Sequence, residues 1–284
     1  MAQSSLPTPI SSLSTEKRYL KPSVFWSIRQ GFPRWLSILI MTLSLAVPLL
    51  VWAAISSTGW VPAMFLPTPW AVLQAGITMF QEGLMTDVLS SCGRVAGGFL
   101  LSVMIGVPMG IAMGTFYSMD SLFAPIVGTV RYMPVMAFVP LIIIWVGLGE
   151  ESKVLIVFLG VVLYNTMMVA DAVKFIPNEM INVAYTLGAS RWDVLFKVIV
   201  PATFPNVLDT VRVNIAGAWN YLVIAELVAA QYGLGFKIWQ SQRFLQTEKV
   251  FFCIALIGII GVLIDYGLKW ISALLTPWAD QTNH

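Results

Sequence analysis

The chain has 284 residues, of which 58% are hydrophobic and 11% charged, and its mean hydropathy is +0.81. A soluble domain is about half apolar and a quarter charged, so this composition is typical of a protein embedded in a lipid bilayer. The net charge of +2 is small and the basic residues form no stripe, which excludes nucleic acid as a partner.

Six segments are apolar over the length of about 20 residues that a helix needs to cross the hydrocarbon core. We therefore predict an all-α, polytopic membrane protein with about six transmembrane helices. The predicted spans are Leu36 to Ser56, Gly97 to Phe116, Leu122 to Val146, Val154 to Val173, Val207 to Ala229 and Phe251 to Leu274.

Residues 1–34 are rich in serine, proline and basic residues and have no apolar periodicity, so they are predicted to form an N-terminal tail. They are not a signal peptide, because the first apolar run is a full span. Residues 35–284 are predicted to form the transmembrane domain. Basic residues precede the first span and fill the loop between the fourth and fifth spans, and by the positive-inside rule both regions face the cytoplasm. We expect both termini to be cytoplasmic in a multi-pass inner (plasma) membrane protein.

The segment before the second span begins FLPTPW and mixes apolar residues with glutamines, which predicts an amphipathic helix at the outer membrane surface. Inside the second span, Gly106, Gly110 and Gly114 form two overlapping G-x-x-x-G pairs, and this spacing predicts close packing against another helix of the same subunit, with a moving, pore-closing contact as the alternative. Arg94, near the start of that helix, is expected to reach a lipid headgroup, with attraction of an anion as the alternative.

The third span is interrupted by Pro134 and Pro140 and contains Arg131. A broken helix is tolerated at membrane depth only where protein or a water-filled cavity satisfies the freed backbone groups, so this span is a candidate pathway wall. Arg131 is predicted to favour anions there. The alternative is that Arg131 pairs with Asp120 or with a lipid headgroup at the cytoplasmic edge.

Ionisable and amide side chains at membrane depth usually face the interior of the bundle and mark a solute pathway. For the asparagines, hydrogen bonds between helices are an equally good interpretation. Asp265, in the last span, is expected to be a structural partner of a neighbouring polar group. The predicted pathway residues are Arg131, Asn165, Asn214, Asn220 and Glu226.

Residues 182–201, NVAYTLGASRWDVLFKVIVP, form a polar, patterned island between the fourth and fifth spans. Apolar residues at helical spacing predict a short helix, with Met180, Val183, Ala184 and Leu187 on one face. Gly188 is expected to end this helix in a left-handed cap. Ser190 and Asp193 predict a capping-box start of a second helix, which Pro201 follows and whose apolar face is Leu195, Val198 and Ile199.

This helix–glycine–helix segment resembles the cytoplasmic coupling loop, or EAA motif, of ABC-transporter permease subunits. Gly188 is in register, and the other matching positions are Asn182, Val183 and Ala184 in place of E-A-A and Val198, Val200 and Pro201 in place of I, L and P. The resemblance implies that the loop at about 174–201 docks on an ABC-type ATPase subunit, without the salt bridge of the missing glutamate. The implied contacts are Asn182, Val183, Ala184, Leu187, Gly188, Ala189, Ser190, Leu195 and Pro201.

Four further elements, LPTPW, SCGRVAGGFLLSVMIGVPMG, RYMPVMAFVPLIIIWVGLGEESK and AELVAAQYGLGF, resemble importer permeases for nitrate, sulfonate, taurine and bicarbonate. The resemblance implies a type I ABC importer permease fold and a small anionic solute, with sulfonate or taurine favoured. It also implies an external substrate-binding protein, ATPase subunits that bind ATP-Mg, and a second copy of this chain. Membrane lipid surrounds the assembly.

The chain has no G-x-x-x-x-G-K-[ST] phosphate loop, so it is predicted to bind no cofactor and to be a transport subunit without catalysis of its own. Cys92 and Cys253 have no metal or redox spacing, and His284 is the sole histidine; we expect no metal site, no disulfide and no His-based triad. The alternative function is an ion-gradient-driven secondary transporter or channel, for which Glu226 and Asp265 are the candidate buried acids.

Overall fold

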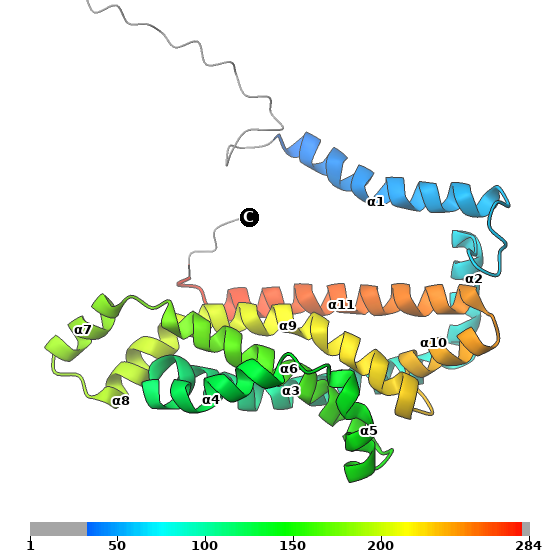
Figure 1. Cartoon of the computed structure of the whole chain (residues 1–284). Coiled ribbons are helices and arrows are strands. Elements are labelled where there is room, and N and C mark those ends of the chain that lie inside the picture. The colour runs from blue at the N-terminus through cyan, green and yellow to red at the C-terminus, as the bar shows by residue number, and fades with distance from the viewer. Residues whose placement is uncertain (1–32, 280–284) are drawn as a thin grey trace, which may run out of the picture. The chain divides into compact units, whose positions relative to one another are not determined.

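The computed structural model describes residues 33–279, and every regular element in that range is a helix, which confirms the all-α class (Figure 1). The predicted tail, residues 1–34, lies almost entirely outside the described residues. The elements are α1 (Arg34–Ser57), α2 (Pro69–Gln81), α3 (Leu84–Thr115), α4 (Tyr117–Val130), α5 (Val135–Val146), α6 (Glu150–Lys174), α7 (Asn178–Thr186), α8 (Arg191–Asp193), the π-helical turn η2 (Val194–Ile199), α9 (Val200–Ala229), α10 (Leu234–Arg243) and α11 (Thr247–Leu275).

The chain divides into two units, residues 1–52 and residues 53–284. The described part of the first unit, residues 33–52, holds most of α1, whose sequence is mainly apolar. The second unit contains the remaining helices, and all the contacts described below lie within it.

Within residues 33–279, five helices are long and apolar enough to cross a membrane, or six spans if the bent pair α4–α5 is counted as one. This count agrees with the six predicted spans. Most boundaries shift by one to five residues, and two differ by more. The second span begins at Leu84, well before Gly97, and the fifth belongs to a continuous helical stretch, Arg191–Ala229, that already starts in the predicted coupling loop.

The third span is broken, as its prolines predict, but at one place only. Helices α4 and α5 are bent by 97° relative to each other. Pro134 is the N-cap of α5, with φ −60° and ψ 121°, whereas Pro140 lies inside α5. The prediction that Pro140 also interrupts the span is therefore wrong. Pro134 breaks the chain because it disfavours the helical conformation of the residue before it.

The core of the second unit is the packing of α6 between α3 and α9 (Figure 1). The glycines of α3 make the first contact possible. A Cβ atom on Gly106 would lie 3.0 Å from the carbonyl oxygen of Val162, and one on Gly110 would lie 2.5 Å from the carbonyl oxygen of Thr166. The prediction that this glycine spacing packs a helix of the same subunit closely is confirmed, because only a hydrogen side chain leaves room for the neighbouring backbone.

Helix α11 packs along α9 beside this core. Helix α10 packs on α9 and α11, and α2 packs on α11. The predicted start of α2 at FLPTPW is confirmed: the side chain of Thr68 accepts a hydrogen bond from the backbone N–H of Ala71, and Pro69 occupies the first turn, where its missing N–H leaves no bond unmade.

Candidate functional site

The loop between α6 and α9 has the predicted helix–turn–helix form. Helix α7 ends at Thr186, and Gly188, two residues later, has φ +84°, in the left-handed region. The N–H of Gly188 donates to the carbonyl of Tyr185 at 2.9 Å, and the N–H of Ala189 donates to the carbonyl of Ala184 at 3.0 Å. These two bonds are a Schellman motif, so Gly188 holds the left-handed cap that its position predicts.

The second helix begins with the predicted capping box. The Ser190 hydroxyl accepts from the N–H of Asp193, and the Asp193 carboxylate accepts from the N–H of Ser190, both at 3.2 Å. The expectation that Pro201 follows the end of this helix is wrong, because helix continues through η2 into α9. Pro201 cannot donate to the carbonyl four residues earlier, and the π-helical turn immediately before Val200 accommodates that break in the ladder.

Most of the predicted coupling residues lie on the surface of this loop. Val183 is 58% exposed and Leu187 is 83% exposed. Leu195 is the exception, since it is 7% exposed and packs against Val173 and Ile199. Leu195 is therefore not on the predicted docking surface. It lies in the hydrophobic cluster beneath the loop. The other predicted contacts are exposed or half-buried, namely Asn182, Ala184, Gly188, Ala189, Ser190 and Pro201.

Sequence reasoning missed an aromatic group beside these residues. Trp192 and Phe196 stack with their ring centroids 6.1 Å apart, and Trp192 meets Phe116 edge-on at 6.4 Å. Both Trp192 and Phe196 are more than half exposed. Their spacing of four residues on a surface helix was the available signal, because such residues lie on one face.

The polar residues predicted to line a pathway lie in different surroundings. Asn165 is fully buried; its Nδ2 donates to the Ser102 hydroxyl at 2.9 Å, and its Oδ1 accepts from Asn214 Nδ2 at 2.7 Å. This chain of hydrogen bonds joins α3, α6 and α9, which favours the interpretation of these asparagines as links between helices. Asn220, by contrast, is exposed and lines a cavity between α9 and α11.

Arg131 lies at the end of α4, at the break in the third span. Its guanidinium is 4.7 Å from the centroid of the Tyr132 ring and donates to the Tyr132 hydroxyl at 2.9 Å. The alternative pairing with Asp120 is wrong, because Asp120 accepts two hydrogen bonds at 2.9 Å from Lys174. The Nε of Arg131 is buried without a hydrogen-bond partner among residues 33–279, so this guanidinium retains donor capacity.

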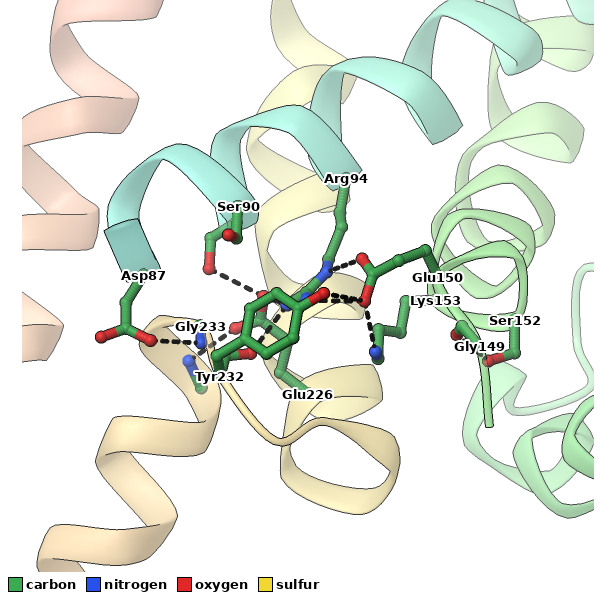
Figure 2. Close-up of polar contacts among 12 residues, drawn as sticks. Asp87, Ser90, Arg94, Gly149, Glu150, Ser152, Lys153, Glu226, Tyr232 and Gly233 are labelled. Carbon is green, nitrogen blue, oxygen red and sulfur yellow. Dashed lines mark hydrogen bonds and ion pairs between the residues drawn. The ribbon is translucent and has the colours of Figure 1, made fainter. Parts of the chain in front are cut away.

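Arg94 is at the centre of a buried ionic network, which we call the Arg94 network (Figure 2). Its Nε and Nη2 donate to the Glu150 carboxylate at 2.5 and 2.9 Å, and its Nη1 donates to Glu226 Oε1 at 2.6 Å and to the Tyr232 carbonyl at 2.9 Å. Arg94 is 3% exposed. The expectation that Arg94 reaches a lipid headgroup is therefore wrong, because its guanidinium forms ion pairs with two carboxylates of the same chain.

Glu226 is fully enclosed by this network. One carboxylate oxygen accepts from Arg94 and from the Ser91 hydroxyl at 2.7 Å, and the other accepts from the N–H of Gly235 at 2.7 Å. Its residue exposure is 0%. The structure thus places Glu226 in a satisfied network that joins α3, α6, α9 and α10, and not on the wall of a cavity, which was its predicted position.

The outer members of the network connect it to the surface. Glu150 accepts from Lys153 at 2.7 Å and from the Tyr232 hydroxyl at 2.9 Å, and its side chain is 47% exposed. Asp87 accepts from the N–H of Gly233 at 2.7 Å (Figure 2). All of these residues lie in or beside the quoted elements SCGRVAGG, GLGEESK and AELVAAQYGLGF. Sequence reasoning missed the network, because the charges of each element carry no local sign of which other element they contact.

Gly233 and Gly235 let the α9–α10 connection approach this network. Gly233 has φ +119°, and a Cβ atom there would lie 2.7 Å from Arg94 Nη1. A Cβ on Gly235 would lie 2.8 Å from the Glu226 Cβ. Any larger residue at either position would displace the ion pair, so the two glycines and the charges of the element AELVAAQYGLGF form one structural unit.

Asp265 behaves as the sequence predicts. Its Oδ1 lies 3.2 Å from the Nε of Arg212, across the contact between α9 and α11. The two acids that a gradient-driven transporter would use, Glu226 and Asp265, are thus each paired with an arginine.

Comparison with known proteins agrees with these features. Residues 103–278 match the family model described as "Binding-protein-dependent transport system inner membrane component". The taurine transport system permease protein TauC of Escherichia coli (strain K12) is 37% identical over 246 residues, covering 84% of this chain and 90% of the relative. The bicarbonate transport system permease protein CmpB of Synechocystis sp. is 28% identical, covering 89% of this chain and 92% of the relative.

The fold has a counterpart among solved structures. An inward-facing structure of the MetNI methionine ABC transporter superposes with a TM-score of 0.63 at 19% identity, covering 69% of this chain and 98% of that chain. The family match extends over more than half of the chain and includes the whole exposed loop. The chain belongs to the family of binding-protein-dependent transport system inner membrane components, and it is a permease subunit of an ABC importer.

Proposed function

We propose that two copies of this chain form the membrane pathway of an ATP-driven importer for a small organosulfonate such as taurine. An external binding protein delivers the solute, and two separate ATPase subunits bind ATP-Mg and supply the energy. The chain itself hydrolyses nothing. The observation that carries this proposal is the exposed helix–glycine–helix loop of α7 and α8, capped at both ends of its turn.

The loop presents the apolar surface that a docking contact needs. Leu187, Val183 and Trp192 are exposed in a segment that the sequence otherwise makes polar. Contiguous exposed apolar residues outside the membrane mark a protein interaction site. The continuous helical stretch Arg191–Ala229 starts in this loop and is 39 residues long. A displacement of the loop by the ATPase would therefore be transmitted along α9 through the core.

The proposed dimer follows from the number of docking loops. An ABC ATPase pair offers two docking surfaces, and this chain supplies one loop of this form among its described residues. A closed two-fold dimer is the simplest assembly that presents two loops. In this arrangement the loop, both termini and the ATPases lie on the cytoplasmic side of the inner membrane.

The proposed solute class comes from the relatives. The curated names of similar permeases include taurine, aliphatic sulfonates, bicarbonate and nitrate, with the taurine permease more similar in sequence than the sulfonate, bicarbonate and nitrate permeases. The shared chemistry is a small solute with a delocalised anionic group. Arg131, with its incompletely bonded guanidinium at the break of the third span, is the proposed anion contact on the pathway.

Leu187→Asp tests the docking loop. A charge placed in an apolar contact is costly, so we expect co-purification with the ATPase subunit to fall by at least roughly ten-fold. Leu148→Asp is the matched control, because Leu148 is 64% exposed in the connection at the opposite end of α6. Undiminished ATPase binding by Leu187→Asp would show that this loop is not the docking surface.

Transport is tested in proteoliposomes that contain the permease, the ATPase and the binding protein. We expect uptake of labelled taurine that requires ATP, and no ATP hydrolysis by the permease alone. Uptake driven by an ion gradient without ATP would contradict the proposal.

A further inference from the structure

A polar pocket, which we call the α10 pocket, lies at the end of the second unit that carries α2 and α10, away from α7 and α8 (Figure 1). It is enclosed by the end of α2, the beginning of α3, the end of α10 and the beginning of α11. Its volume is about 350 Å³, which is within the range of small-molecule sites. The pocket is therefore large enough for a small polar group.

Two lysines line the α10 pocket with unused hydrogen-bond donors. The Nζ of Lys237 lies 3.7 Å from the Asp87 carboxylate, and the Nζ of Lys249 lies 3.6 Å from the Glu82 carboxylate. Both separations exceed hydrogen-bond length, and neither ammonium group makes a hydrogen bond to another residue of 33–279. Because each ammonium group carries three donors, the lining can offer several N–H groups to an acceptor.

Ser241 adds a further donor. It lines the pocket and is 4% exposed, and its hydroxyl makes no hydrogen bond within the described part of the chain. A serine in a helix usually donates to a carbonyl of the preceding turn, as Ser90 does in α3. The carbonyl oxygens of Gln240, Ser241 and Gln242 at the end of α10 each accept a backbone N–H. The acceptors at this helix end are therefore occupied, while the Ser241 hydroxyl remains available.

Two long helices begin at the pocket. Leu84, the first residue of α3, and Gln246, the N-cap of α11, both line it, and neither helix has a side-chain cap at its N-terminus. An uncapped N-terminus carries a partial positive charge and unpaired N–H groups. Asp87 and Glu248, in the first turns of the two helices, offset part of this charge. Together with the lysines, the two helix ends make the pocket suited to an oxoanion.

Glu82 is the acidic residue of the lining. Its side chain is 56% exposed and makes no hydrogen bond to residues 33–279, so its ion pair with Lys249 is weak. An oxoanion can replace the Glu82 carboxylate at Lys249, because this carboxylate is free to turn into solvent. Asp87 lies outside the lining, and the backbone N–H of Gly233 donates to it at 2.7 Å.

Large apolar side chains are exposed at the edge of the pocket. Phe244 lines it and is mostly exposed, and Phe80 and Met85, next in sequence to lining residues, are exposed as well. Helices α3 and α11, which begin here, are both long and apolar enough to cross the membrane. The pocket is thus at the depth where lipid headgroups meet the protein, and its apolar edge suits acyl chains.

We propose that the α10 pocket binds a phosphate group. Lys237 and Lys249 form ion pairs with the phosphate oxygens, and the Ser241 hydroxyl donates a hydrogen bond to one of them. Two sources share this chemistry: the headgroup of a membrane phospholipid and free inorganic phosphate. The apolar edge formed by Phe80, Met85 and Phe244 favours the phospholipid.

The test uses the full-length protein with the subunits that co-purify with it, in nanodiscs of equal parts phosphatidylglycerol and digalactosyldiacylglycerol. The galactolipid has the same acyl chains but no phosphate. Native mass spectrometry counts the lipids that the released complex retains. We expect wild type to retain roughly ten-fold more phosphatidylglycerol than galactolipid. Equal retention of the two lipids, without binding of inorganic phosphate, would overturn the proposal.

The double variant Lys237→Gln/Lys249→Gln removes both positive charges and should lose this preference for phosphatidylglycerol. Lys237→Arg/Lys249→Arg keeps the charges and should retain most of it, which separates a loss of binding from a loss of folded protein. Lys269→Gln is the matched control, because Lys269 is an exposed lysine of α11 outside the pocket. An equal loss of phosphatidylglycerol in Lys269→Gln and in the double Gln variant would overturn the location of the site.

A second arm distinguishes the two sources of phosphate. Phosphorus NMR of the lipid-depleted complex in detergent measures binding of inorganic phosphate. Binding that the double Gln variant loses, without any preference for phosphatidylglycerol, identifies free phosphate as the ligand. Retained phosphatidylglycerol without binding of inorganic phosphate identifies a lipid headgroup site.

A contact with the external binding protein is the competing interpretation of these lysines. If the double Gln variant loses co-purification with the binding protein but retains phosphatidylglycerol and inorganic phosphate as wild type does, the lysines serve a protein interface and the proposal is overturned. None of these measurements requires solute uptake, so the phosphate site and the importer function can fail independently.

Discussion

Arg94→Met tests how strongly the Arg94 network holds the fold. The substitution keeps an unbranched side chain of similar length but removes the guanidinium, which makes three hydrogen bonds to two carboxylates and one to a backbone carbonyl. It leaves Glu226, whose side chain is 0% exposed, as a buried negative charge with two neutral donors, Ser91 and Gly235. Breaking a buried pair in this way lowers the free energy of unfolding by roughly 3–5 kcal/mol.

Glu150→Gln is the control within the same network. The Glu150 side chain is 47% exposed, and its loss leaves Arg94 paired with Glu226, so we expect a loss of about 1 kcal/mol or less. The double variant Arg94→Met/Glu226→Leu removes both buried charges. Its loss in the free energy of unfolding should be smaller than the summed losses of Arg94→Met and Glu226→Leu measured singly, with a coupling of roughly 2–3 kcal/mol.

The assay is equilibrium unfolding of the purified permease in mixed micelles, followed by circular dichroism during titration with a denaturing detergent. Equal losses for Arg94→Met and Glu150→Gln would refute the argument, as would strict additivity in the double variant. Either result would mean that Glu226 finds compensation outside the contacts described above.

Three further outcomes are expected. Gly110→Ala should lower the free energy of unfolding by roughly 1–3 kcal/mol, because its Cβ would press on a backbone carbonyl of α6. Gly93→Ala, which places its Cβ in open space on the same helix, should raise the free energy of unfolding by up to about 1 kcal/mol. The same unfolding assay checks both variants. Gly188→Ala forces a side chain into the left-handed backbone region, which costs roughly 1–2 kcal/mol of conformational energy. It should reduce both co-purification of the ATPase and ATP-driven solute uptake. Gly128→Ala should leave both unchanged. Arg131→Ala should lower anion uptake per inserted molecule, with part of the activity retained in Arg131→Lys; equal normalised uptake in wild type and Arg131→Ala would remove Arg131 from the pathway.

Local features of this chain were predictable because their causes are local. The left-handed cap at Gly188 and the capping box of Ser190 and Asp193 depend on residues within a few positions of each other, and the structure has both as predicted. The six apolar segments were recognisable because span length depends only on bilayer thickness and helix rise. The glycine spacing of α3 likewise indicated a close helix contact before the partner helix was known.

Positions that depend on distant residues were not predictable in this way. The family resemblance puts Leu195 among the docking contacts, but the structure buries it against Val173, because the loop folds back on the end of α6. The sequence pattern predicts that a helix ends before Pro201, but a π-helical turn just before Val200 lets the helix continue through Pro201.

The sequence by itself determined the class of the protein: a bundle of apolar helices with one capped, exposed loop, because hydrophobic length and capping are properties of short segments. Only the tertiary structure decided what the charges do. Arg94, Glu150 and Glu226 lie up to 132 residues apart in the chain, and nothing in their local surroundings shows that they meet. At membrane depth a charge has to find an opposite charge or water, and which of the two it finds depends on which helices pack together.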